Sequence, residues 1–288
     1  MNVRKRLFWA ALFNIAIVLA EIIGGIFSKS TALLSDAVHN TGDVISMLFA
    51  LIGSYMAIKS KNEVFTYGYK RAEIVSSLVN STFIIIMGGF ILFEGVKKII
   101  YPHAINPKIL LPVAIVGLLG NAFTLLMLHE HHHEHLNVEA AWVHIMADTI
   151  SSVLVVILGI LFFFKDYYFL DGVVSVGIAA YMVAMAIPIF KKSALILMEA
   201  NVGNITSSKI KEELFEIDGV NDIHHIHIWN MDERNTYVEL HIKKSDNVSN
   251  DEILKRVYDK LKGMGVSHAT VQVEEKICTD EREVELSG

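Results

Sequence analysis

Two His-Asp pairs lie inside long apolar stretches, where ionisable side chains are rare. His39 precedes Asp43 by four residues, and His144 precedes Asp148 by the same interval. On an α-helix this interval places two side chains one turn apart on one face. Either pair alone is explained as well by hydrogen bonds that hold helices together. Two pairs with identical spacing favour one shared site, because charged groups in an apolar span are costly.

These four side chains have the ligand types and the number that zinc prefers, two imidazole nitrogens and two carboxylate oxygens. The two carboxylates would balance a divalent cation, whereas an empty site leaves two negative charges in a low-dielectric interior. Protons can neutralise such a site after the metal leaves, because His titrates near neutral pH and neighbouring carboxylates readily share protons. The pattern predicts exchange of a divalent transition metal, zinc above the others, for protons.

Two further acidic residues occur in the same apolar stretches. Asp36 lies one turn before His39, where it either orients the imidazole from behind or starts a helix near the membrane interface. Glu21 is a candidate for a proton or ion path. Lys70, Arg71 and Glu73 follow the second stretch, where they act either as snorkelling anchors at the lipid headgroups or as a charge lock to a second domain.

Six apolar stretches must position these residues. Hydrophobic residues make up 53% of the chain and the mean hydropathy is +0.45, values too apolar for an ordinary soluble domain. We expect a bundle of six membrane-spanning helices, because lipid leaves each backbone polar group to be satisfied within its own segment. The expected spans are residues 7–27, 32–58, 74–100, 109–128, 140–164 and 170–190.

The two ends of the chain are expected in the cytoplasm. Lys and Arg are more frequent in the loops on the side of the termini, which predicts this orientation. The first stretch follows Arg4, Lys5 and Arg6, but it is longer than the apolar part of a signal peptide and is expected to be a retained span. The only cysteine, Cys278, cannot form an internal disulfide, which suits a reducing compartment.

Near Asn201 the sequence changes to charged, ordinary soluble periodicity. We expect a membrane domain over residues 1–200, an α+β domain over 201–276 and a polar tail over 277–288. The second domain is predicted as αββαβ, with helices near 210–217 and 249–264 and strands at 220–229, 236–243 and 267–274, the helices covering one side of a small sheet. Strict alternation would put His224 on one strand face with Ile226 and Ile228, and His225 on the other.

The chain resembles the cation diffusion facilitators, a family of heavy-metal efflux transporters. The resemblance covers nearly the whole sequence and rests on SDAVHNTGD at 35–43, FTYGYKRAE at 65–73, HIMAD at 144–148, IHHIHIW at 223–229 and HATVQVE at 268–274. It implies six spans, a cytoplasmic metallochaperone-like (ferredoxin-like) domain, a homodimer and proton-coupled zinc export by alternating access. The transport ligands would be His39, Asp43, His144 and Asp148.

The same resemblance implies a second metal site in the cytoplasmic domain, where zinc would act as a regulatory or structural ion. The matching positions are His224 and His241, with Glu274 and His268 nearby. His225 stands where many relatives have Asp, so it is a further possible ligand. Any one of these histidines taken alone is more often a packed or exposed strand residue than a ligand.

A histidine-rich tract separates the fourth and fifth stretches. Its histidines are His129, His131, His132, His133 and His135. His129, Glu130 and His133 also fit HExxH, the pattern of helical zinc proteases. A tract of this composition produces that pattern by itself, so a cytoplasmic loop that gathers metal ions is favoured, with a plain solvated linker as the alternative.

The expected partners are divalent metal ions, protons, the lipid bilayer of the cell membrane and a second copy of the chain. A net charge of −6 without a concentrated basic face argues against nucleic acid. The ligand types leave zinc, cadmium, cobalt, nickel, iron and manganese open. Two rival functions remain at this point, an intramembrane zinc metallohydrolase and a membrane metal sensor.

Overall fold

The computed structural model describes residues 3–129 and 136–274. Within these ranges the side chains of residues 3–14, 43, 46–47, 50–51, 54, 123–129, 136–145 and 147 are not described. The chain divides into two compact units. The helical unit comprises residues 1–51 and 79–190, and the sheet unit comprises residues 52–78 and 191–288.

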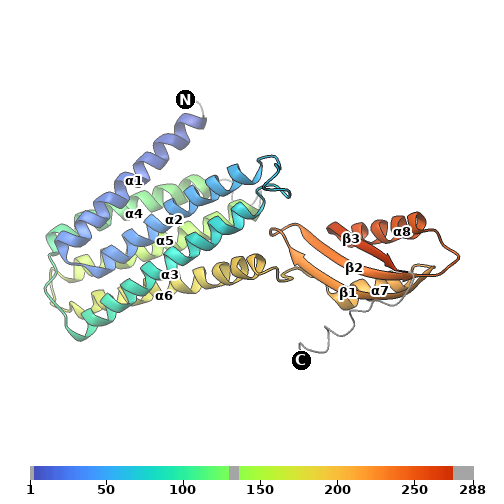
Figure 1. The fold of residues 1–288 in the computed structure, drawn as a ribbon. Helices are drawn as coiled ribbons and strands as arrows, with labels where there is room; N and C mark the ends of the chain where they lie inside the picture. The colour runs from blue at the N-terminus through green and yellow to red at the C-terminus, as the bar shows by residue number, and fades with distance from the viewer. Residues whose placement is uncertain (1–2, 130–135, 275–288) are drawn as a thin grey trace. The chain divides into compact units, whose positions relative to one another are not determined.

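Among the described residues, six long helices follow one another in the first two thirds of the chain (Figure 1). They are α1 (Val3–Ser28), α2 (Thr31–Ala57), α3 (Arg71–Ile100), α4 (Pro107–His129), α5 (Leu136–Leu161) and α6 (Phe169–Leu197). The prediction of a six-helix bundle is confirmed. The last helix runs seven residues beyond the expected end of the sixth span at residue 190, because apolar residues recur as far as Leu197.

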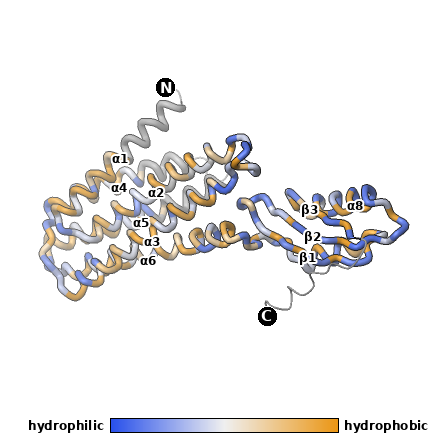
Figure 2. The backbone as a smooth tube through the Cα atoms, in the orientation of Figure 1, coloured by the Kyte–Doolittle hydropathy of each residue, from blue (hydrophilic) through white to orange (hydrophobic). Residues whose placement is uncertain are grey.

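Apolar side chains cover the outside of this bundle. On α3, Ile86, Phe90 and Phe93 are 63%, 61% and 66% exposed, and Figure 2 shows hydrophobic residues along most of α3 and α6. Of the residues with described side chains, α3 and α6 alone are long and apolar enough to cross a membrane by length and composition. Contiguous exposed apolar surface of this kind is typical of a face that meets lipid.

The interior of the helical unit packs closely. Leu33 of α2, Leu110 of α4 and Leu158 of α5 belong to one buried cluster. Helices α3 and α6 approach each other at two glycines: a Cβ on Gly172 would lie 2.6 Å from the carbonyl oxygen of Gly95. Small residues allow such contacts in apolar bundles, where van der Waals packing replaces the hydrophobic effect.

A buried ion pair ties the start of α2 to α3 and α6. Asp171 of α6 accepts hydrogen bonds from the backbone N–H of Thr31 at 2.6 Å and from the hydroxyl of Ser30 at 2.5 Å. Lys98 of α3 lies 2.9 Å from the same carboxylate and also donates to the carbonyl of Lys29. Lys98 lies near the end of the expected third span, 74–100. It is buried and pairs with Asp171, which caps α2.

The sheet unit contains the predicted αββαβ order. Its elements are α7 (Ser207–Phe215), β1 (Val220–Asn230), β2 (Thr236–Lys244), α8 (Asn250–Gly263) and β3 (Val266–Glu274). The sheet order is β1-β2-β3, with β1 and β2 antiparallel and β2 and β3 parallel. The helix start expected at Ser249 is confirmed, because its side chain accepts a hydrogen bond from the N–H of Glu252 at 3.2 Å.

Both helices of this unit cover the same face of the sheet. Ile210 of α7 and Ile253 of α8 are buried in one cluster with Val238, Leu240 and Ile242 of β2. Core and outward residues alternate along β2, so His241 lies on the opposite face from its neighbours Leu240 and Ile242. That opposite face carries the polar residues described below.

Candidate metal sites

The first site lies between α2 and α5. His39 Nε2 lies 2.8 Å from Asp148 Oδ1, and both residues are buried, at 8% and 6% exposure. The two residues are separated by 109 positions in the sequence, so only packing of the two helices brings them together. The structure thus joins one half of each predicted His-Asp pair.

Asp36 forms a second link between these helices, one turn from His39. Its carboxylate accepts hydrogen bonds from the hydroxyls of Ser151 at 2.6 Å and Ser152 at 2.9 Å. Ser151 also lies 2.8 Å from the carbonyl of Asp148, and its single proton can serve only one of the two acceptors at a time. Ser152 in turn accepts from Asn121 of α4 at 2.9 Å.

Asp36 is therefore a buried interhelical residue rather than a helix start, since α2 begins five residues earlier, at Thr31. The two serines had not been singled out from the sequence. They lie three and four residues after Asp148, on the same face of α5, which is the signal that could have identified them.

The contacts also fix the relative direction of the two helices. Asp36 pairs with residues 151 and 152, and His39 pairs with residue 148, so position numbers rise on α2 as they fall on α5. In this antiparallel register the next turn brings position 43 opposite position 144. The backbones of Asp43 and His144 are helical, and their side chains lie outside the description.

The second site lies on the open face of the sheet. His224 Nε2 is 3.1 Å from Glu274 Oε2, and His241 Nδ1 is 2.9 Å from Glu274 Oε1. One ligand atom from each of the three residues lies within 4.8 Å of the others. Adjacent ligand atoms around tetrahedral zinc are separated by about 3.3 Å, given metal–ligand bonds of ~2.0–2.1 Å. The donor set and its spacing therefore fit one zinc ion.

Two further features suit an ion at this second site. His241 Nδ1 is buried and has no hydrogen bond of acceptable geometry among the described residues, although it lies beside Glu274. His224 Nδ1 lies 3.1 Å from Asp222 Oδ2. A carboxylate on the far nitrogen fixes the orientation of a ligating imidazole, so Asp222 is a supporting residue that sequence reasoning missed.

A β-bulge creates this arrangement, and it corrects the alternation expected for β1. The register steps from His224↔His241 to His227↔Glu239, so two residues of β1 oppose one residue of β2. His225, in the bulge, has φ of 48°, a conformation uncommon for residues other than glycine. Ile223, Ile226 and Ile228 therefore face the core, and His224 does not share their face.

The remaining predicted ligands of the sheet unit lie elsewhere. The ring centroid of His225 is 5.0 Å from that of His241, near the site but outside the three-residue group. His268 lies opposite Tyr237 in the strand register, and its ring makes an edge-on contact with the ring of Tyr67. His268 and Glu274 are six positions apart on β3, roughly 20 Å at ~3.3 Å per residue, so the structure does not bring His268 to this site.

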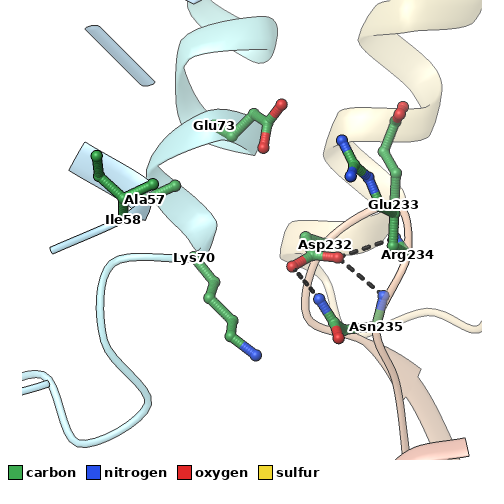
Figure 3. Close-up of a pocket in the computed structure, with 8 residues that line it drawn as sticks. All are labelled: Ala57, Ile58, Lys70, Glu73, Asp232, Glu233, Arg234 and Asn235. Carbon is green, nitrogen blue, oxygen red and sulfur yellow. Dashed lines mark hydrogen bonds between the residues drawn. The ribbon is translucent and has the colours of Figure 1, made fainter. Parts of the chain in front are cut away.

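The loop between α2 and α3 forms contacts within the sheet unit. Arg71 pairs with Glu199 at 3.1 Å, and Lys70 Nζ lies 3.5 Å from the Tyr237 hydroxyl. Figure 3 shows Lys70 and Glu73 on one side of a cavity of about 260 Å³, with the turn 232–235 on the other. Its lining has mixed charges without a convergent ligand set.

The histidine tract at residues 130–135 lies outside the described residues, as does the side chain of His129. The metal-gathering role expected there remains a prediction.

Comparison with known proteins covers both units. Residues 7–198 match the family described as cation efflux transmembrane domain, and residues 202–276 match cation efflux protein, cytoplasmic domain. The zinc transporter ZitB of Yersinia pestis is 31% identical over 277 residues, which cover 95% of this chain and 88% of that protein.

Similar proteins also occur in a Gram-positive bacterium and in a mammal. A cadmium, cobalt and zinc/H(+)-K(+) antiporter of Bacillus subtilis (strain 168) is 30% identical over 262 residues, covering 89% of this chain and 84% of that protein. The proton-coupled zinc antiporter SLC30A2 of Mus musculus is 26% identical over 288 aligned residues, covering 94% and 78%. The similarity thus extends over both units rather than over a shared fragment.

Proposed function

The chain belongs to the cation efflux family of multi-pass membrane transporters, and from that premise we propose that it exports a divalent transition metal, zinc above the others, in exchange for protons. Its α+β domain is cytoplasmic. The observation that supports the proposal most is the buried contact between His39 and Asp148, which joins two spans through groups that bind either a metal ion or protons.

The proposed transport site consists of His39, Asp43, His144 and Asp148. The antiparallel register of α2 and α5 supports this set, because positions 43 and 144 are opposite one another on the turn next to the His39–Asp148 pair. Two imidazoles and two carboxylates would complete a tetrahedral shell around the metal being carried. After its release, protons neutralise the carboxylates, since two uncompensated negative charges in a low-dielectric interior are unfavourable.

The family consists of transporters, and the chain is not an enzyme. The HExxH pattern of His129, Glu130 and His133 therefore has no hydrolytic role, and a metal-gathering role of the histidine tract remains our proposal. A membrane sensor would bind metal without moving it, so a flux measurement separates the transporter from this last rival.

The decisive experiment uses the purified full chain in lipid vesicles that contain a zinc-sensitive dye, with a pH gradient imposed across the membrane. We expect zinc flux in the unaltered protein and its loss in His39→Ala and Asp148→Ala. The exposed His227→Ala and Asp246→Ala serve as matched controls and should transport normally. If both site variants move zinc as fast as the unaltered protein, the site assignment is wrong.

We further propose that the cytoplasmic domain holds a regulatory zinc ion at His224, His241 and Glu274 in each copy of a homodimer. The fit of the three donor atoms to one ion supports this site. Its position on the sheet face that α7 and α8 leave open supports a role near a second copy. A bound ion would neutralise Glu274 and so reduce repulsion between two acidic faces.

The test replaces Cys278 by Ser, introduces one cysteine on α8 of the full chain for labelling, and measures the distance between the labels of the two copies during a zinc titration. Zinc should shift that distance in the unaltered protein, and Glu274→Gln should abolish the shift. No shift in the unaltered protein would contradict the regulatory role.

A further inference from the structure

Glu21 of α1 is a buried carboxyl group that the transport site does not use. It is 1% exposed. Its Oε2 accepts a hydrogen bond of 3.0 Å from the side-chain amide of Asn40 on α2. Its Oε1 is buried and has no hydrogen-bond partner among the described residues. Buried polar atoms are nearly always paired, so an unpartnered carboxyl oxygen calls for an explanation.

The surroundings of Oε1 are shaped for the carboxyl group. A Cβ atom added to Gly117 of α4 would lie 2.0 Å from Oε1, far inside van der Waals contact. The carboxyl group therefore occupies a notch that exists because position 117 has no side chain. Any residue larger than glycine at this position would force the carboxyl group to move.

The charged groups around Glu21 are few. Along α1 no other titratable residue occurs between Arg6 and Lys29, and along α4 none occurs between Lys108 and His129. From α2 the facing groups are Asp36, a buried carboxyl group that acts electrostatically on Glu21, and His39, which directly precedes Asn40. Asp148 of α5 follows through its contact with His39.

This environment disfavours the ionised form of Glu21 unless a cation is close. The carboxylate would have one hydrogen-bond donor and a second buried carboxyl group, Asp36, as its charged neighbour. A buried charge without compensation is unfavourable, so Glu21 holds a proton when the site is empty. A divalent cation bound at His39, one residue from Asn40, attracts the ionised form and displaces that proton.

We propose that Glu21 carries a coupling proton of the antiport cycle, outside the set of metal ligands. Metal entry breaks the O–H bond of the Glu21 carboxylic acid, and the proton leaves to water. When the metal departs on the other side, the carboxylate takes a proton from water there. The inference rests on the proposed metal/proton exchange and adds a residue whose task is the proton alone.

The test counts protons released for each zinc ion bound by the purified full chain, from calorimetric titrations in buffers of different ionisation enthalpy. Glu21→Gln keeps the size and the polar contact with Asn40 but cannot ionise. It should bind zinc within about tenfold of the unaltered affinity and release roughly one proton fewer. In vesicles it should lose most of the acceleration that an opposing pH gradient gives.

A second variant leaves Glu21 in place. Gly117→Ala should reduce the proton count in the same direction, because its methyl group displaces the carboxyl group from the notch. Gly177→Ala is the matched control, since a Cβ there meets no atom within 4 Å, and it should release as many protons as the unaltered protein.

The outcomes separate the two proposals. If the unaltered protein binds zinc without releasing protons, the antiport proposal falls and this inference with it. If it releases protons and both Glu21→Gln and Gly117→Ala release just as many, Glu21 is a structural residue and the inference alone is overturned.

Discussion

The helical unit and the sheet unit both bring histidine and carboxylate together, but at different depths and on different scaffolds. In the helical unit His39 and Asp148 are almost fully enclosed, and apolar helices surround them. In the sheet unit the side chains of His224 and His241 remain 20% and 18% exposed. Water can therefore compensate charge at the second site, whereas at the first site only a metal ion or protons can do so.

This contrast is consistent with separate tasks for the two proposed sites. A deeply enclosed site couples ion release to protonation, which suits transport. A partly solvated site exchanges its ion with the cytoplasm without that coupling, which suits regulation. We therefore expect substitutions in the two units to have different effects, with the largest at the proposed metal sites.

The strongest test removes one carboxylate from each site. Asp148→Asn should lower zinc flux in vesicles at least ~100-fold, since loss of a ligand exceeds the ~10–100-fold effect of outer-shell changes. Glu274→Gln should change flux only within about threefold when cytoplasmic zinc is saturating. Equal losses in the two variants would show that the sites do not have separate tasks.

Zinc binding at the sheet site gives the next largest effect. In an Asp148→Asn background, which disables the transport site, Glu274→Gln should weaken the remaining zinc binding by more than ~10–100-fold, because that range applies to outer-shell changes and Glu274 is a proposed ligand. His268→Ala is the matched control, because His268 lies with Tyr67 and Tyr237 instead of the site. Calorimetric titration measures both. A larger effect of His268→Ala than of Glu274→Gln would contradict the assignment.

The two units also differ in how far the sequence predicted their sites. On the helices a spacing of four residues predicted one site shared by α2 and α5, because a helix has a fixed period whatever surrounds it. The structure describes one contact of that site, between His39 and Asp148. The same reasoning could not identify Asp171 as the partner of Lys98. That pair depends on the packing of α3 against α6, which one-dimensional periodicity does not contain.

On β1 the two-residue period of a strand is interrupted at His225. Strict alternation assigned His224 to the face of Ile226 and Ile228, but the bulge at His225 reverses the faces before and after it. A β-bulge does not require glycine or proline, so the sequence contains no residue that marks it. The bulge here depends on the pairing with β2, in which His224 lies opposite His241. The sequence thus predicted the order of elements but not this local register.

The hydrogen bonds from Ser151 and Ser152 to Asp36 in the helical unit contribute a smaller effect, on stability. Ser152→Ala removes one of two donors to the buried Asp36 and the acceptor of Asn121. We expect a loss of about 1–3 kcal/mol in the free energy of unfolding in detergent, as for other buried polar groups left unpaired. Ser35→Ala is the control, since its hydroxyl bonds only the carbonyl of Thr31 in the same helix, and it should stay within ~0.5 kcal/mol. Equal stability of Ser152→Ala and Ser35→Ala would show that the hydrogen bond from Ser152 to Asp36 does not stabilise the helical unit.

The smallest effect concerns surface ion pairs of the sheet unit, which are exposed to water, unlike the buried His39 and Asp148 of the helical unit. Lys260 of α8 donates to Glu213 of α7 at 2.6 Å and to Glu216 at 3.0 Å. The hydrogen bond and charge of Lys260 lower the pKa of Glu213 below its ordinary value of 4.5. A lowered carboxyl pKa contributes stability that is complete above pH 4.5 and is lost as the pH falls through the folded-state value.

Lys260→Met should therefore lower the Tm of the sheet unit by no more than a few degrees at neutral pH, because exposed pairs contribute little. The difference from the unaltered protein should shrink as the pH falls below 4.5 and vanish below the lowered pKa of Glu213, where this residue is protonated in both proteins. Fluorescence of Trp229 follows this transition once Trp9 and Trp142 are replaced by Phe. A difference that persisted at low pH would mean that Lys260 stabilises the packing of α7 on α8 through its aliphatic stem rather than through its charge.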